Sequence, residues 1–143
     1  MGDASAPAWE HFHHVADIGV RGVGHTLAEA FEQAALAMTA VILEPDAVVE
    51  RKSIELELSA PDNELLLTEW LNALIYEMAT RRMLFGRFEV SLQGHRLKGR
   101  AWGEDIDLAR HQPAVEIKGA TLTELRVWGD EEGLWHAQCV VDV

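Results

Sequence analysis

The residues best suited to chemistry close the sequence, in the stretch Leu134-Trp-His-Ala-Gln-Cys-Val-Val-Asp-Val143. Apolar and polar residues alternate here as they do in a strand, which places Asp142 on one face and Val141 and Val143 on the other. Because the sequence ends inside this strand, we expect the Asp142 side chain and the Val143 α-carboxylate to form two adjacent oxygen anions. A divalent cation would relieve their repulsion. The alternative, which this stretch by itself favours, is an ordered C-terminal strand whose carboxylates are simply solvated.

A second acidic position lies near the start of the chain. Asp17 falls in an apolar stretch where strand propensity and burial both disfavour a carboxylate. If the first and last strands pair, Asp17, Asp142 and Val143 would bring three hard oxygen donors together. Such donors favour Ca²⁺, with Mg²⁺ or Mn²⁺ as alternatives, and water or a partner would complete the shell of calcium. The spacing in the sequence leaves open whether these strands pair.

Histidines cluster just before Asp17, at His11, His13 and His14. On a strand His11 and His13 share a face, as the ligands of a transition metal can. A zinc site would need a further pair of histidines or cysteines at typical spacing, and the chain has one cysteine, so we do not favour zinc. His14 is instead expected to orient Asp17 through a hydrogen bond.

Two further polar residues are candidates for contact with a partner. Lys118 lies in a predicted strand, where it is either a solvated side chain or a cation close to the acidic group. His111 lies in an acidic loop over residues 103–113 and is equally ambiguous. No glycine-rich phosphate-binding loop and no nucleophile-elbow serine is present, so the sequence gives little support to an ordinary hydrolase or nucleotide-binding enzyme.

The composition predicts a single globular domain over residues 9–143 after a flexible leader, residues 1–8. The chain has 143 residues, 48% of them hydrophobic, and a formal net charge of −12. Phosphate backbones would repel so acidic a chain, so we expect no direct high-affinity nucleic-acid binding. The negative electrostatic field of the chain would instead attract a cation or a basic protein. The sequence lacks a membrane-spanning run and a signal peptide, from which we expect a cytoplasmic protein.

Periodicity predicts the elements that would position these residues. A helix is expected over residues 26–44, where Thr26 and Glu29 form a capping box, and another over residues 64–82. Period-two alternation predicts strands over residues 53–60, 88–92, 97–102, 115–128 and 134–143. We therefore expect an α+β fold in two layers, with a mostly antiparallel sheet and the two helices packed on one face.

Five short motifs, in this order, resemble those of the archease family across nearly the whole ordered length. They are His14-Val-Ala-Asp-Ile-Gly19, Leu27-Ala-Glu-Ala-Phe-Glu32, Leu65-Leu-Leu-Thr-Glu-Trp-Leu-Asn72, Ile117-Lys-Gly-Ala-Thr121 and Asp142-Val143. The resemblance implies a small α+β domain related to the strand-helix-strand-strand group.

The same resemblance implies a function. It points to a protein cofactor, not an enzyme, that promotes guanylylation and multiple turnover of an RtcB-type GTP-dependent RNA ligase in tRNA splicing and RNA repair. The family's metal site would map onto Asp17, Asp142 and Val143, and Lys118 matches a lysine of the family motif beside that site. His14 and His111 stay candidates for contact with the partner.

This sequence also departs from the family pattern. Val15 stands where threonine is usual, Gly119 where alanine is common, and Leu122-Thr123 where an aromatic residue and a histidine are frequent. Two rival functions remain open at this point. One is a stand-alone metal-dependent phosphoesterase that uses the loop over residues 104–111, and the other is a chaperone-like module whose cation is purely structural.

Overall fold

The structure, a computed structural model, describes residues 6–14 and 17–143. The long helices are α1 (Leu27–Ile42) and α2 (Asn63–Arg81), and the short ones are η2 (Pro45–Ala47) and α3 (Leu108–His111). The strands are β1 (Ala8–His14), β2 (Asp17–Gly24), β3 (Lys52–Ser59), β4 (Met83–Gln93), β5 (Arg96–Asp105), β6 (Gly119–Ala120), β7 (Arg126–Gly129) and β8 (Trp135–Asp142).

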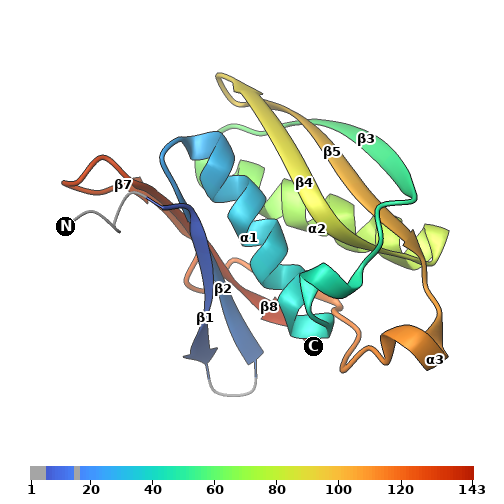
Figure 1. Ribbon diagram of the computed structural model, residues 1–143. Helices are drawn as coiled ribbons and strands as arrows, with labels where there is room; N and C mark the ends of the chain where they lie inside the picture. Colours follow the sequence, from blue (N-terminus) through green and yellow to red (C-terminus); the bar gives the residue numbers. More distant parts are fainter. Residues whose placement is uncertain (1–5, 15–16) are drawn as a thin grey trace.

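Within these ranges the strands form two antiparallel sheets. Sheet A has the order β1-β2-β8-β6, with β7 also paired to β8, and sheet B has the order β3-β5-β4. Helix α1 contacts β2 and β8 of sheet A and β4 of sheet B, and α2 likewise contacts both sheets. Figure 1 shows the helices between the sheets. The predicted α+β class, antiparallel pairing and pair of long helices are confirmed; the strands, however, divide between two sheets instead of forming one.

Helix α1 begins where the sequence predicts. Thr26 accepts a hydrogen bond from the Glu29 main-chain N–H at 3.0 Å, and Glu29 accepts one from the main-chain N–H of His25 at 2.7 Å. The helix packs directly on β2, because a Cβ at Gly22 would lie 2.1 Å from the main-chain oxygen of Ala30. A glycine in β2 therefore sets how closely α1 approaches sheet A.

Helix α2 is capped by Asp62, whose side chain accepts from Leu65 N at 2.8 Å. Its Trp70 is fully buried and donates its indole N–H to the main-chain oxygen of Phe31 at 3.1 Å, which joins the two long helices. The resulting core is continuous from sheet A through α1 and α2 to sheet B.

Two of the predicted elements differ from the structure. The strand expected over residues 115–128 is wrong for most of its length, since β6 and β7 cover only its Gly119–Ala120 and Arg126–Trp128 parts. The loop expected over residues 103–113 instead contains the end of β5 and helix α3. Residues 1–5 of the expected leader, and Val15, lie outside the described residues. Among the residues that are described, no helix is long and apolar enough to cross a membrane.

Candidate metal centre at the acidic end of sheet A

Asp17 and Asp142 occupy facing positions at one end of sheet A. Strands β2 and β8 pair antiparallel with Ile18 opposite Val141, and one further step in the same register places Asp17 opposite Asp142. Residues directly opposite in an antiparallel ladder point to the same face. Val141 belongs to the buried core on the helix side, so alternation directs both carboxylates to the other face, where Asp142 is exposed and Asp17 half-buried.

The segment that carries Lys118 lies on the opposite edge of β8. The Lys118 main-chain N–H donates to the main-chain oxygen of Asp142 at 2.8 Å, and β6 continues the pairing with Gly119 opposite Asp142. Lys118 therefore occupies the position opposite Val143, and its exposed side chain leaves from the face opposite the two carboxylates. The structure thus brings Asp17, Asp142, Val143 and Lys118 to one end of the sheet.

Asn72 in the middle of α2 holds this segment in place. Its side-chain oxygen accepts from the Ala120 main-chain N–H at 2.9 Å, and its amide nitrogen donates to the Ala120 main-chain oxygen at 3.4 Å. The amide side chain thus pairs with β6 as a neighbouring strand would. Thr121 on the far side donates its main-chain N–H to Val140 O at 2.9 Å. The position of Lys118 beside Asp142 depends on these contacts.

His14 lies directly opposite Asp17 in the β1–β2 ladder. Its Nδ1 atom is buried and has no hydrogen-bond partner among the residues that the structure describes. The expected hydrogen bond from His14 to Asp17 is therefore not among the contacts of this structure. A buried nitrogen without a partner beside two carboxylates fits a site that binds a cation and its water molecules, because such an atom otherwise costs free energy.

The oxygen donors at this end of the sheet are few. Over residues 6–14 and 17–143, no three His, Cys, Asp or Glu side chains come close enough together to hold a metal ion. A cation here would thus rest on Asp17 and Asp142 with main-chain oxygen from Val143, and the remaining ligands would come from water or a partner.

His111 does not join this group. It is buried at the end of α3, where Nδ1 accepts from the Asp107 main-chain N–H at 2.8 Å and Nε2 donates to Glu104 at 3.0 Å. Glu104 is 2% exposed and also accepts from the main-chain N–H of Val49 at 2.7 Å and from Arg110. Both ring nitrogens of His111 are thus engaged, Nδ1 with the N-cap of α3 and Nε2 with Glu104 of β5.

The environment of Glu104 keeps it ionised. Burial alone raises the pKa of this carboxyl group, but hydrogen bonds from Val49, His111 and Arg110 outweigh burial and lower the pKa to about 2. The sequence alone does not single out Glu104, because a glutamate near two other acids in a predicted loop looks like a solvated residue. It does not single out Asn72 either, and no local signal could have revealed its contact with Ala120.

Comparison with known proteins assigns the chain to a family. Residues 9–143 match the family described as the Archease protein family (MTH1598/TM1083). The chain belongs to this family. The archease of Thermococcus gammatolerans is 40% identical over 139 residues, which cover 94% of this chain and 98% of that protein. The archease of Pyrococcus furiosus is 37% identical with the same coverage.

A solved structure agrees with this assignment. The solution structure of Methanobacterium thermoautotrophicum protein 1598 superposes with a TM-score of 0.84 at 33% identity, and the match covers 95% of this chain and 99% of that one. The predicted family is thus confirmed. In this archease, Leu65-Leu-Leu-Thr-Glu-Trp-Leu-Asn72 lies in α2 and ends at the residue that holds β6, so the motif has a structural role at the candidate site.

Proposed function

We propose that this archease is a metal-binding protein cofactor of an RtcB-type GTP-dependent RNA ligase. In this proposal it promotes guanylylation of the ligase and so permits multiple turnover in tRNA splicing or RNA repair. Membership of the family, together with the facing positions of Asp17 and Asp142 at one end of sheet A, supports the proposal. The site is built on strands, which can hold its donors more rigidly than a loop.

The proposed metal is Ca²⁺, with Mg²⁺ or Mn²⁺ as alternatives. Asp17, Asp142 and main-chain oxygen of Val143 would bind it, and the buried Nδ1 of His14 would contact its water shell. When bound, the cation supplies a fixed positive charge at an otherwise negative end of the sheet. Asn72 positions the Lys118 segment beside these donors.

The residues at this end favour a cofactor over a stand-alone enzyme. At this end of the sheet, the described side chains to which we assign a role are the carboxylates of Asp17 and Asp142, the amide of Asn72, the ammonium of Lys118 and the imidazole of His14. The sole cysteine, Cys139, is fully buried, and burial raises its pKa to about 12, so it is a poor nucleophile. A phosphoesterase would need substrate groups from the loop over residues 104–111 near the metal, but Glu104 and His111 of that loop are bonded to each other.

Charge supports a protein partner with a basic surface. The chain carries 24 acidic and 12 basic residues, and opposite charge accelerates the encounter with an RNA-binding enzyme. We therefore expect activation of the ligase to weaken as the salt concentration rises.

Multiple-turnover ligation by the cognate ligase, with GTP and Mn²⁺, tests the proposal. Wild-type protein should raise turnover, and Asp142→Ala should fold but fail to do so. Glu69→Ala, which removes one negative charge from an exposed position on α2, is the control and should behave as wild type. If wild-type protein leaves turnover unchanged while the ligase stalls after one round, the activator function is wrong.

Two further measurements separate the rival functions. Hydrolysis of phosphate esters by the purified protein, abolished in Asp17→Ala, would instead establish a phosphoesterase. A purely structural cation predicts that its removal lowers thermal stability yet leaves activation intact at a temperature where the domain stays folded.

A further inference from the structure

The outer face of sheet B carries a row of cations along its central strand. Alternation in β5 directs Leu97, Gly99 and Ala101 into the core, and Arg96, Lys98 and Arg100 outward, where all three are exposed. This face is remote from the acidic end of sheet A. Figure 1 shows the β4–β5 turn and the C-terminus at opposite ends of the molecule.

The cations in this row differ in their ion pairs. Arg100 pairs with Glu55 at 3.1 Å, and Arg87 on the neighbouring strand pairs with Glu50 and Glu89 at 3.1 and 3.0 Å. Arg96 and Lys98 form no ion pair with any described residue. The two cations nearest the β4–β5 turn are thus available to an anion from outside.

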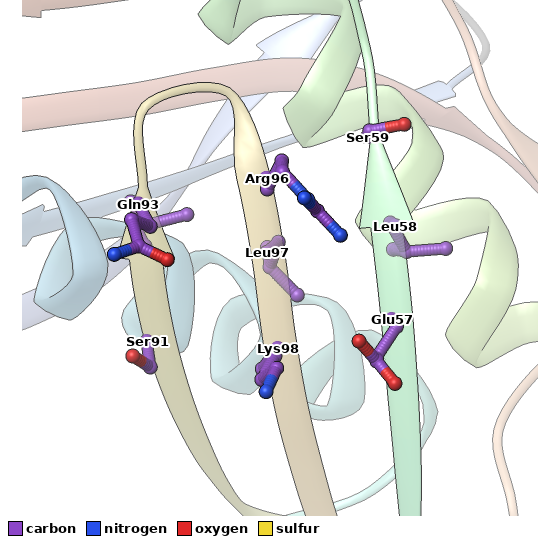
Figure 2. Close-up of a pocket in the computed structure, with 9 residues that line it drawn as sticks. Glu57, Leu58, Ser59, Ser91, Gln93, Arg96, Leu97 and Lys98 are labelled. Atoms are coloured by element: carbon purple, nitrogen blue, oxygen red, sulfur yellow. The ribbon is translucent and has the colours of Figure 1, made fainter.

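The neighbours of Arg96 and Lys98 are mostly neutral hydrogen-bonding groups. The strand register places Ser59 and Gln93 on either side of Arg96, and Ser91 and Glu57 on either side of Lys98. These residues line a shallow hollow on the sheet, with Arg96 and Lys98 in its middle strand, as Figure 2 shows. Guanidinium, ammonium, hydroxyl and amide groups are the usual donors to phosphate oxygens. Glu57 is the one carboxylate among the residues that line the hollow, and Glu55 and Glu89 lie on either side of Arg100 beyond it. These carboxylates oppose such a ligand.

The spacing of the row suits an extended ligand with repeated charges. Alternate residues of a strand lie about 6.6 Å apart, so Arg96, Lys98 and Arg100 present successive cations along one line. At the end of this line the ring of the half-buried Trp102 is already contacted by two guanidinium groups, those of Arg87 and Arg100, at 4.2 and 5.7 Å from the ring centre. A line of cations that can follow a phosphate backbone is typical of surfaces that bind single-stranded nucleic acid.

We propose that the outer face of sheet B binds the phosphate backbone of a single-stranded nucleic acid through Arg96, Lys98 and Arg100. Because β5 is hydrogen-bonded to β3 and β4 on both sides, the ligand must lie across the side chains and cannot add as a strand. Binding through about three phosphates on so acidic a protein is weak, with a Kd of roughly 10⁻⁴ M or above, and carries no base specificity.

Fluorescence anisotropy of a labelled short oligouridine, titrated with the full chain over a series of KCl concentrations, tests the proposal. About three phosphate contacts to a single strand give a slope of log K against log salt of about −2. Arg96→Ala/Lys98→Ala should weaken binding at least about tenfold and reduce the slope to about −0.7. Glu57→Gln should strengthen binding, because it removes the opposing charge from the hollow.

A matched control distinguishes the effect of this surface on binding from the effect of the protein's net charge. Arg81→Ala/Arg126→Ala changes the net charge equally at exposed positions on α2 and β7, and should bind as wild type. Equal binding by the Arg96/Lys98 variant and wild type would overturn the proposal. Equally effective competition by an oligoglutamate of matched charge would show that the surface binds acidic peptides and would overturn the assignment to nucleic acid. The assay contains no ligase, so its outcome is independent of the activator function.

Discussion

Replacing Glu104 by glutamine removes the charge of the carboxylate that links β5 to α3 while keeping the shape of its side chain. In the wild type this carboxylate accepts hydrogen bonds from Val49 N at 2.7 Å and from His111 at 3.0 Å, and it pairs with Arg110. The glutamine amide would keep one acceptor oxygen. Its NH₂ group would replace the second oxygen and face donors that it cannot accept from. Glu104→Gln should therefore unfold more readily.

The size of the effect follows from the same contacts. A decrease in the pKa of Glu104 from 4.5 to about 2 corresponds to about 3 kcal/mol, at about 1.4 kcal/mol for each factor of ten in proton affinity. Breaking a fully buried ion pair costs about 3–5 kcal/mol. The side chain of Arg110 is 45% exposed and can turn to water, which favours the lower end of that range. We expect a loss of about 3 kcal/mol, or roughly 10 °C in Tm.

Urea unfolding of both proteins across acidic pH measures this contribution. A group whose pKa is lower in the folded state stabilises the fold above its unfolded pKa and loses that contribution as the pH falls through its folded pKa. The difference between wild type and Glu104→Gln should therefore be constant above pH 4.5 and shrink progressively towards pH 2.

The control is Glu55→Gln, the same substitution on the adjacent strand β3. The side chain of Glu55 is 74% exposed and pairs with Arg100 at 3.1 Å, so this change should cost less than about 1 kcal/mol. The buried carboxylate does not stabilise this fold through its charge if Glu104→Gln loses no more free energy of unfolding than the control at neutral pH. The same conclusion follows if the loss is unchanged at pH 2.

Other predictions test the candidate site and the packing around it. Calcium at about 100 times its Kd should stabilise wild type by about 2.7 kcal/mol in thermal denaturation, and Asp142→Asn should abolish this gain; equal stabilisation of both proteins would remove Asp142 from the site. Asn72→Leu should cost about 2 kcal/mol in urea unfolding, because it leaves half-buried main-chain groups of β6 without partners, and should also weaken calcium binding measured by titration calorimetry. Gly22→Ala should destabilise the protein by more than about 3 kcal/mol because its Cβ would overlap helix α1, whereas at Gly119, where the nearest atom would be 3.6 Å away, alanine should change stability by less than about 1 kcal/mol. The thiol of Cys139 should resist modification by a thiol reagent until the protein unfolds, since burial raises its pKa to about 12; rapid labelling of the native protein would contradict its burial.

Short-range features account for what the sequence predicted well. The capping contacts of Thr26 and Asp62 join residues three apart, and the turn between β4 and β5 needs a positive φ, which Gly94 adopts at +62°. Such contacts are encoded within one turn of the chain, so the limits of α1, α2 and the hairpin follow from local residues. The predicted strand over residues 115–128 failed because a strand exists only where a partner pairs with it. Strand β8 pairs with two separate short parts of that stretch.

The sequence by itself determined the class of the fold, its helices, most of its strands and an acidic pair worth testing, because propensity and periodicity act over a few residues. Only the tertiary structure decided that Asp17 faces Asp142, that Asn72 holds the Lys118 segment beside them, and that Glu104 and His111 are buried together. The first of these pairs lies 125 residues apart along the chain, so its register depends on how the core aligns β2 with β8. The sequence pattern can suggest that two such side chains lie close together. The packing of the sheets on the helices determines whether they do.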